Sequence, residues 1–454
     1  MNKKVHLSMI NLGCNKNLVD SQLFLWKLLS ENVDSIEYFS DPYDKKVQIV
    51  LLNTCSFISS WREEMFKTID KFISLNKKVC IIWCWVQYFE KLLKSKTILD
   101  KESKLELTRW QNLLKNENIS YLSWNDLSLA NLQSLTLRST KFNDFCRYSA
   151  PRLLTNYENR YEYLKIAEWC NNSCAFCIIP QIRWKLTSLP VQDVIKDAEN
   201  LLKQWIEELI IVAQDTMRYW TDFSSTSQLL PLLHELDKLP YDFRYRILYL
   251  YPDILTLKQL EDFATLKKFI PYFDIPLQHI SPRLLKTMWR FYDDKMIHTL
   301  LKWIRTLFPG AFIRTNVIIW FPWETEKDIE LLKAFLDENY FDNIALFEYH
   351  DEPLSPSSSF ENKVSDGVVH SRFNVIHKQV DNLMDKREKK RENKKQIWFV
   401  EWIRQYKKNI LLTIRPEINC PEIDPVDEVK LENVLQCFDW DEINIWSKVE
   451  YILK

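Results

Sequence analysis

Three closely spaced cysteines, Cys170, Cys174 and Cys177, carry the most specific chemical signal in this sequence of 454 residues. They lie in the segment YLKIAEWCNNSCAFCIIP, at the end of an apolar run. Three thiolates at this spacing suit an iron–sulfur cluster, and most 4Fe–4S clusters take four cysteines. Three ligands would leave one iron open to a small molecule. The alternative is a structural zinc site, but such sites usually have four ligands, and no histidine lies near these cysteines.

A second set of three cysteines, Cys14, Cys55 and Cys84, follows three short apolar runs near the N-terminus. These runs are of strand type and cover residues 5–11, 47–53 and 79–83. In open α/β sheets the ligand sites gather at the carboxyl ends of the strands. The three thiols are therefore expected to converge on a second cluster, although any one of them alone is more often a buried core cysteine.

The other four cysteines, Cys80, Cys146, Cys420 and Cys437, have no such pattern and are interpreted as structural. Ten cysteines without a secretory signal indicate a reducing compartment and metal ligation rather than disulfides. The N-terminus MNKKVHLSMINLGC reads as a strand and not as a signal peptide, and no run of 18 apolar residues occurs. The prediction is a cytoplasmic protein with no membrane contact.

The pattern of elements predicts an α/β protein in four parts. Residues 1–140 alternate strand and helix, which indicates a parallel-sheet domain, and 141–160 form a polar linker. Residues 161–395 repeat strand and helix six times, as in a partial (β/α)6 barrel, and end in a long polar helix. Residues 396–454 read as about five short strands forming a small antiparallel β-barrel.

The sequence has 3 glycines and 18 tryptophans. Average usage is roughly 7% glycine, which would give about 30 in this chain. Tryptophan stands at several positions where a turn needs glycine, for example at Trp440 between two strand-like runs and at Trp320 and Trp323 between a strand and a helix. We hypothesise that these codons are UGA, read as glycine by the source organism and written here as tryptophan. Ordinary aromatic core residues are the alternative.

Several segments together resemble the methylthiotransferases, a family of radical S-adenosylmethionine enzymes. The matching segments are NLGCNKNLVDSQ, LNTCSFISSWREE, IIWCWVQ, AEWCNNSCAFCIIPQIRWKLTSLP, LIIVAQDTMRYWTD, LYLYP, DIPLQH and IRTNVIIWFPWETE. The resemblance runs from end to end, and its last part is the small barrel called TRAM. The departures are mostly tryptophans where the family has glycine, namely Trp83, Trp169, Trp184, Trp205, Trp220, Trp320 and Trp323.

The resemblance implies two 4Fe–4S clusters and S-adenosylmethionine. Cys170, Cys174 and Cys177 would hold the cluster that binds S-adenosylmethionine and generates a 5′-deoxyadenosyl radical. Cys14, Cys55 and Cys84 are expected at an auxiliary cluster that carries the methylsulfide. The clusters would supply the hard chemistry, and the protein the binding and the exclusion of water.

Polar residues at strand ends are the candidates for the cofactor pocket of the barrel. Gln214 and Gln278 each end a predicted strand, Arg246 and Arg314 begin strand segments, and Glu324 starts a helix after a strand. The alternative for each is an ordinary strand-end polar residue or a buried ion pair. His279 next to Gln278 is a weak candidate for a base.

Two branches of the family differ in substrate. One adds the methylthio group to the β-carbon of an aspartate in small-subunit ribosomal protein twelve, and the other modifies an adenosine of transfer RNA. The segments AQDT, LYLYP, IPLQH and GCNKNLVDS resemble the protein-modifying branch more than the transfer-RNA branch. The net charge of −1 also favours a protein substrate, because a nucleic-acid-binding protein gains from a basic surface.

The remaining expectations concern partners. An electron donor protein is expected, and a ribosomal RNA contact through the TRAM-like part or the charge run DKREKKRENKK is possible, although such a run is most often a solvated helix face. A non-catalytic iron–sulfur carrier is the alternative from another class.

Overall fold

A computed structural model describes residues 4–31, 33–95, 99–122, 151–155, 159–182, 185–364, 366–389, 395–406, 409–434, 436–437 and 445–452. The chain divides into two compact units. The first contains 1–155, 163–200 and 350–360, and the second contains 156–162, 201–349 and 361–454. Most of the predicted linker, 141–160, lies outside the described residues. The predicted domain boundaries therefore stay a prediction.

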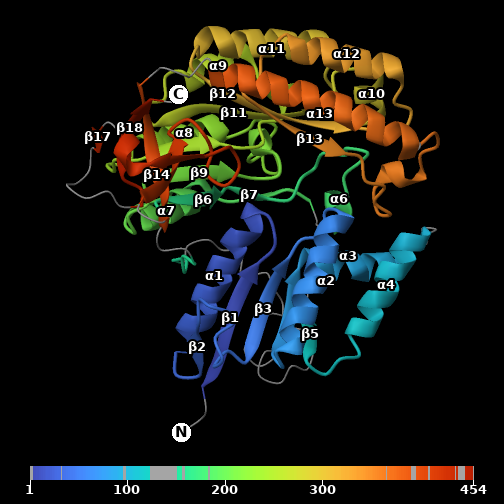
Figure 1. The fold of residues 1–454 in the computed structure, drawn as a ribbon, viewed down its shortest axis with the longest axis vertical. Coiled ribbons are helices and arrows are strands. Elements are labelled where there is room, and N and C mark those ends of the chain that lie inside the picture. The colour runs from blue at the N-terminus through green and yellow to red at the C-terminus, as the bar shows by residue number, and fades with distance from the viewer. Residues whose placement is uncertain are drawn as a thin grey trace. The chain divides into compact units, whose positions relative to one another are not determined.

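The first unit is built on a five-stranded parallel sheet in the order β2-β1-β3-β4-β5 (Figure 1). Its strands are β1 Val5–Asn11, β2 Ile36–Tyr38, β3 Ile49–Thr54, β4 Lys78–Trp83 and β5 Ile119–Leu122. Its helices are α1 Asn15–Glu31, α2 Ser59–Ser74, α3 Cys84–Lys94 and α4 Lys101–Leu113. The same unit contains the hairpin β7 Ala167–Glu168 and β8 Thr187–Ser188, with helix α6 Ile179–Ile182 and most of helix α7 Val191–Leu202.

Both faces of this sheet are covered, because successive strand residues point to opposite sides. Val50 and Leu52 of β3 pack with α2, α3 and α4, whereas Ile49 and Leu51 pack with α1. The near-continuous apolar runs in β3 and β4 follow from this burial, as is usual for parallel sheets between helical layers. The predicted parallel-sheet domain is confirmed.

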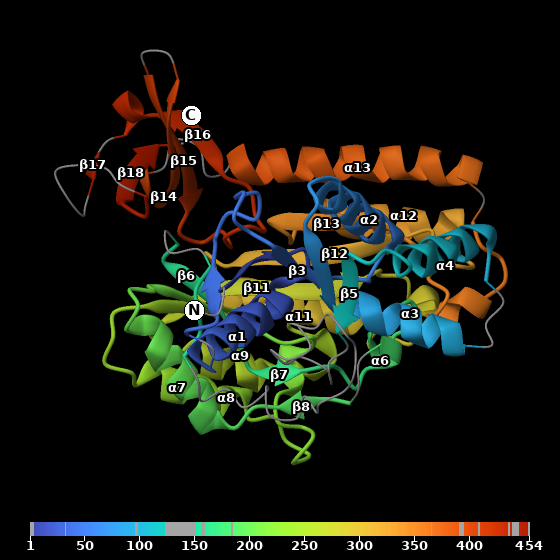
Figure 2. The same cartoon turned by 90° about the horizontal axis from the view of Figure 1, so that it is seen from below.

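The second unit contains most of a six-stranded sheet in the order β13-β12-β11-β10-β9-β6, with parallel pairing from β9 to β13 (Figure 2). The strands are β6 Tyr161–Lys165, β9 Glu208–Val212, β10 Arg244–Ile247, β11 Phe269–Gln278, β12 Phe312–Ile319 and β13 Asn343–Glu348. Neighbours in the sheet are neighbours in sequence, as a partial (β/α) barrel requires.

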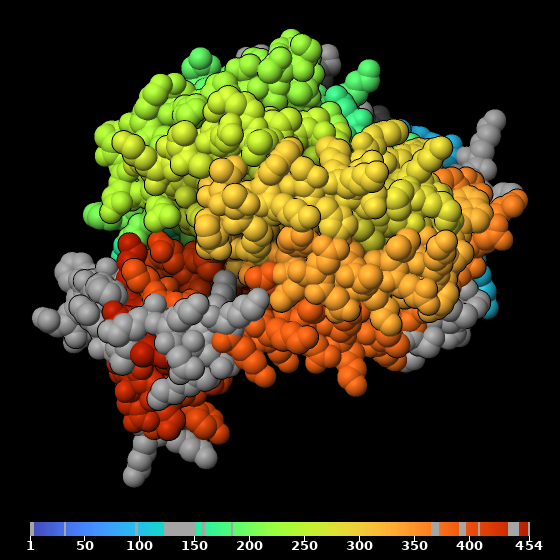
Figure 3. Space-filling model, turned by 90° about the horizontal axis from the view of Figure 1, so that it is seen from above, coloured from blue at the N-terminus to red at the C-terminus, as the bar shows by residue number. Residues whose placement is uncertain are grey.

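Helices connect these strands and form an outer layer. They are α8 Leu229–Asp237, α9 Leu257–Phe263, α10 Pro282–Thr287, α11 Asp294–Leu307 and α12 Glu326–Asp337. The long polar helix predicted before residue 395 is α13 Asp366–Lys389, which packs beside α12 and β13. In Figure 3 its red-orange surface lies next to the lighter orange surface of α12. No helix among the described residues is long and apolar enough to span a bilayer.

The C-terminal part is a curled antiparallel sheet in the order β16-β15-β14-β18-β17. Its strands are β14 Lys395–Tyr406, β15 Asn409–Pro416, β16 Asp427–Lys430, β17 Gln436–Cys437 and β18 Lys448–Ile452. Trp398, Val400, Leu412, Ile414 and Val449 form its core. The predicted small antiparallel β-domain is confirmed.

Tryptophan occupies the left-handed backbone region with unusual frequency. Among the described residues, eight tryptophans have φ between 59° and 74°. They are Trp83, Trp169, Trp205, Trp220, Trp289, Trp320, Trp323 and Trp446. Only glycine enters this region without a steric cost. The fold therefore demands glycine at positions where the written sequence has an indole, which supports the recoding hypothesis at these eight positions.

The end of α10 shows this demand in one motif. Trp289 has φ 59°, its N–H bonds to the carbonyl of Lys286, and the N–H of Arg290 bonds to the carbonyl of Leu285. This pair of hydrogen bonds defines the Schellman helix end, whose left-handed residue is usually glycine. Trp289 stands at that residue.

Candidate cluster and cofactor sites

Cys14, Cys55 and Cys84 each follow a strand, β1, β3 and β4, and these three strands are neighbours in the sheet. Cys14 precedes α1, Cys55 follows β3, and Cys84 is the first residue of α3, directly after β4. Since Thr54 and Trp83 are paired in the sheet, Cys55 and Cys84 leave the same edge of the sheet side by side. Cys55 and Cys84 are buried and Cys14 is half-buried.

One side chain, Asn17 in the first turn of α1, contacts two of these thiols. Its carboxamide oxygen lies 3.6 Å from the sulfur of Cys14, and its nitrogen lies 3.7 Å from the sulfur of Cys84. Cys14 and Cys84 are therefore brought to one point. These two distances concern the sulfurs of Cys14 and Cys84, so the convergence of all three thiols, Cys55 included, remains a prediction.

A buried ion network fixes the loop after Cys55. Arg62 donates to the carbonyl of Ser56 at 3.0 Å, to Glu106 at 3.0 Å and to Glu352 at 2.8 Å. The guanidinium also lies 4.6 Å from the ring centre of Tyr88. Burial raises the pKa of Glu352 to about 7, although Arg62 opposes the shift.

The second trio lies in the loop between β7 and α6. Cys174 is buried, and Cys170 and Cys177 are half-buried. The backbone N–H of Asn172 donates to the sulfur of Cys170 at 3.3 Å, and the N–H of Cys177 donates to the carbonyl of Cys174 at 3.1 Å. An N–H directed at sulfur favours the thiolate form that a metal requires.

Neither trio is a ready metal site as the side chains stand. Within the described part of the chain, no three histidine, cysteine, aspartate or glutamate side chains are grouped closely enough to hold a metal ion. The donor set nevertheless suits iron–sulfur clusters, because each trio offers three thiols on one loop or at one sheet edge. Their role as cluster ligands stays a prediction.

The other described thiols fit the structural interpretation. Burial raises the pKa of Cys80 to about 12 and that of Cys420 well above its usual value, so both remain protonated at neutral pH. Cys437 lies in β17, and Cys146 lies outside the described residues.

Three of the predicted pocket residues follow the carboxyl ends of strands in the second unit. Gln214 follows β9, Gln278 is the last residue of β11, and Glu324 follows β12. The carboxamide oxygen of Gln214 is buried and has no hydrogen-bond partner among the described residues. Gln278 has φ 71°. These positions match the end of a barrel where catalytic residues usually lie.

Glu324 is held by its own turn. Its carboxylate accepts the N–H of Trp320 at 2.7 Å and pairs with Arg372 of α13 at 3.2 Å. Burial raises the pKa of Glu324 to about 7, while the Trp320 N–H and Arg372 oppose the shift. His279 is fully buried, and desolvation lowers its pKa to about 4, which makes it neutral at pH 7.

Arg246 is the third of the four residues of β10, Arg314 is the third residue of β12, and both side chains already have partners. Arg246 donates to Glu208 at 2.6 Å and to the carbonyls of Glu417 and Ile418. Arg314 pairs with Asp274 at 2.9 Å. These contacts are the buried ion pairs that the sequence left open as an alternative, and the predicted cofactor role of both arginines stays untested.

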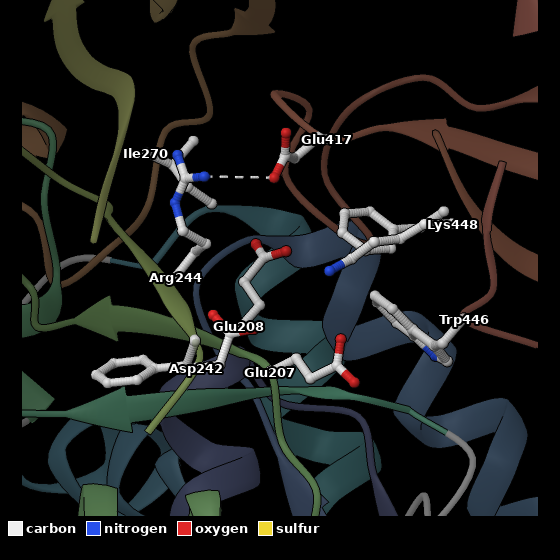
Figure 4. Close-up of a pocket in the computed structure, with 10 residues that line it drawn as sticks. Glu207, Glu208, Asp242, Arg244, Ile270, Glu417, Trp446 and Lys448 are labelled. Carbon is white, nitrogen blue, oxygen red and sulfur yellow. Dashed lines mark ion pairs between the residues drawn. The ribbon is translucent and has the colours of Figure 1, made fainter. Parts of the chain in front are cut away.

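A small pocket lies beside Arg246, between the amino ends of β9 and β10 and the C-terminal sheet (Figure 4). Glu207, Glu208, Arg244, Glu417 and Lys448 line it, and Arg244 pairs with Glu417 at 3.5 Å. Because the pocket lies at the amino ends of the strands, we interpret it as part of the seam that attaches the C-terminal sheet to the barrel.

Sequence reasoning missed the two polar anchors of the N-terminal site. Asn17 stands three residues after Cys14 in the quoted segment NLGCNKNLVDSQ, so its spacing places it one helical turn away. Arg62 and Glu352 lie 290 residues apart in sequence, and no local pattern signals their pairing.

Comparison with known proteins gives two family matches. Residues 164–336 match the model of the radical SAM superfamily, and residues 6–101 match that of the uncharacterized protein family UPF0004. The first match contains Cys170, Cys174 and Cys177, and the second contains Cys14, Cys55 and Cys84.

Two curated relatives cover almost the whole chain. A ribosomal protein uS12 methylthiotransferase RimO of Chlamydia pneumoniae is 32% identical, over 94% of this chain and 88% of that protein. One of Clostridium novyi (strain NT) is 30% identical, over 98% and 97%. Among solved structures, the radical S-adenosylmethionine methyltransferase TsrM from Kitasatospora setae matches with a TM-score of 0.50 and 11% identity, over 78% of this chain and 77% of that one. This last likeness concerns the fold alone.

Proposed function

Since this chain belongs to the ribosomal protein uS12 methylthiotransferase family, we propose that it adds a methylthio group to the β-carbon of an aspartate in that ribosomal protein. The observation that carries the proposal is the match to such enzymes over nearly the full length, with both sets of three cysteines inside the matched residues. The family also makes the chain a radical S-adenosylmethionine enzyme with a 4Fe–4S cluster.

We assign the radical-generating cluster to Cys170, Cys174 and Cys177, and a second 4Fe–4S cluster to Cys14, Cys55 and Cys84. When bound, the clusters and S-adenosylmethionine supply the radical and the sulfur transfer. The chain supports the thiolates: the backbone N–H of Asn172 donates to the sulfur of Cys170, and the N-terminus of α1 adjoins Cys14. Arg62 holds the carbonyl of Ser56 and so keeps the Cys55 loop in place.

For S-adenosylmethionine we propose contacts from Gln214, Gln278 and Glu324. Gln214 offers an unused acceptor to the cofactor's cationic groups, and Glu324 supplies a carboxyl fixed by the Trp320 N–H. Arg246 and Arg314 are weaker members of this set, because carboxylates already occupy their guanidinium groups.

The favoured substrate is a protein and not transfer RNA. A chain with a net charge of −1 lacks the broad positive field with which nucleic-acid-binding proteins hold phosphates. A ribosomal substrate implies work in the cytoplasm, with an electron donor protein as a further partner. A ribosomal RNA contact through the C-terminal sheet would help to locate the substrate.

The proposal is tested by the formation of 5′-deoxyadenosine from S-adenosylmethionine. The reconstituted enzyme is incubated with reductant and with uS12 or transfer RNA, and a C170A variant serves as the control. We expect formation that uS12 stimulates and C170A abolishes. Stimulation by transfer RNA instead would favour the branch of the family that modifies transfer RNA. No 5′-deoxyadenosine at all would favour a non-catalytic iron–sulfur carrier.

A further inference from the structure

Asn17 is the polar centre of the edge that carries Cys14, Cys55 and Cys84. Its side chain is fully buried. The two N–H groups of its carboxamide nitrogen are shared among three acceptors, Asn53 at 3.1 Å, the carbonyl of Thr54 at 3.0 Å and the sulfur of Cys84 at 3.7 Å. The carboxamide oxygen faces Cys14 at 3.6 Å. One side chain thus reaches all three cysteine-bearing loops, since Thr54 directly precedes Cys55.

The orientation of this carboxamide is fixed by its neighbours. Asn53 returns a hydrogen bond from its own nitrogen to the backbone carbonyl of Asn17 at 2.6 Å, and another to Ser21 at 2.5 Å. Two oxygens therefore face the nitrogen of Asn17, which identifies that end as the donor. The donor end points at Cys84, and the acceptor end at Cys14.

Gly13 supplies the space for Asn17. A methyl group placed on Gly13 would lie 2.4 Å from the carboxamide nitrogen of Asn17 and 2.6 Å from its Cβ. Gly13 does not have a positive φ, so the backbone conformation itself admits other residues. The glycine is required by the close approach of Asn17, which is an independent sign that this side chain has one allowed place.

We propose that Asn17 is a positioning residue for the second cluster, holding the three loops together and donating a hydrogen bond to the Cys84 thiolate. This inference rests on the proposed function, because it assumes that the three thiols bind a cluster. Hydrogen bonds to the ligand sulfurs help to set the reduction potential of an iron–sulfur cluster. A donor stabilises the more negative, reduced form most, so its loss lowers the potential.

The test uses the full chain with Cys170, Cys174 and Cys177 replaced by alanine, so that only the second cluster can form. Iron per chain is counted after anaerobic reconstitution, and the midpoint potential is measured by a redox titration followed by electron paramagnetic resonance. N17L removes the carboxamide N–H donor with little change in side-chain size, and N17D replaces the carboxamide nitrogen with a charged oxygen. N112L changes an exposed asparagine of α4 and is the matched control.

The parent should bind about four iron atoms. N17L should shift the reduction equilibrium about tenfold toward the oxidised form, which is 59 mV for a one-electron couple. N17D should shift it further or lose iron while keeping the parent's unfolding midpoint. G13A should act in the same direction, because its methyl displaces the donor, and N112L should match the parent.

Two results overturn the inference, and they differ from each other. A parent that binds no iron refutes the second cluster, and with it any role for Asn17 there. A parent that binds iron, with N17L, N17D and G13A at the parent's potential and iron content, refutes Asn17 alone. A shift in N112L equal to that in N17L would also refute it, because the effect would then not belong to the site.

Discussion

Replacing Trp289 with glycine should give a more stable protein than replacing it with alanine. Trp289 has φ 59° and is the left-handed residue at the end of α10. Both variants lose the same indole, which is partly exposed. The difference between them therefore isolates the backbone, because alanine keeps the steric conflict of a Cβ at positive φ and glycine does not.

The magnitude follows from two opposing terms. A left-handed conformation costs an L-residue about 1–2 kcal/mol. Glycine loses more chain entropy on folding, which costs about 0.5–1 kcal/mol relative to alanine. The midpoints of these ranges give a free energy of unfolding that is about 0.8 kcal/mol higher for W289G than for W289A. Trp26 lies inside α1 and gives the opposite expectation, since glycine in a helix is about 1 kcal/mol worse than alanine.

The assay is urea unfolding of four variants, W289G, W289A, W26G and W26A, each made in a chain with glycine at the other seven tryptophan positions that have positive φ. The free energy of unfolding is expected to be higher with glycine than with alanine at position 289, and lower with glycine than with alanine at position 26. Alanine equal to or better than glycine at both positions would refute the argument that the fold demands glycine at 289.

The same reasoning covers all eight tryptophans at positive φ. At about 1–2 kcal/mol each, their combined strain is about 8–16 kcal/mol, which equals the entire stability of a typical domain. A chain made as written would scarcely fold, so the gene should carry UGA at these positions. UGG codons there would contradict the recoding hypothesis.

Three further predictions follow from the sites. Replacing Trp169, Trp320 and Trp323 together by glycine should restore binding of S-adenosylmethionine, measured by equilibrium dialysis. The reason is that Trp169 adjoins Cys170 and that the other two tryptophans lie at the turn that holds Glu324. Strong binding by the all-tryptophan chain would count against this placement of the pocket. Replacing Cys14, Cys55 and Cys84 by alanine should reduce the iron content from about eight to about four atoms per chain, whereas C80A should leave it unchanged; an equal loss in C80A would contradict the assignment. Burial raises the pKa of Glu324 and of Glu352 to about 7, from the usual 4.5. Between these pH values the folded chain therefore binds more protons than the unfolded chain. The free energy of unfolding should then fall by up to about 1.4 kcal/mol per pH unit for each group as the pH rises from 4.5 to 7. Urea unfolding of E324Q/E352Q should show a flatter slope over that range, and an unchanged slope would refute the two shifts.

Much of the fold was predictable because its strands are apolar runs. The run 5–11 coincides with β1, and the run 79–83 overlaps β4. The strands β2 and β5 were not predicted, because edge strands of three and four residues carry too little periodicity.

The candidate site, like the fold, has parts that the sequence predicts and parts that it does not. The cysteines are visible in sequence because their spacing or strand-end position is local. The contacts that hold them are not local: Arg62 meets Glu352 across 290 residues, and Asn17 meets Thr54 across 37. For Arg246, the sequence placed the residue at the beginning of a strand but gave no sign that the C-terminal segment at 417–418 would supply its partners.

The central claim is that this chain transfers a methylthio group to uS12. The most direct test is the mass of uS12 after incubation with the reconstituted enzyme, reductant, a sulfide source and S-adenosylmethionine carrying either an ordinary or a trideuterated methyl group. We expect a gain of about 46 Da on one aspartate, and about 3 Da more with the labelled cofactor. An unmodified uS12 beside a methylthiolated transfer RNA adenosine would contradict it.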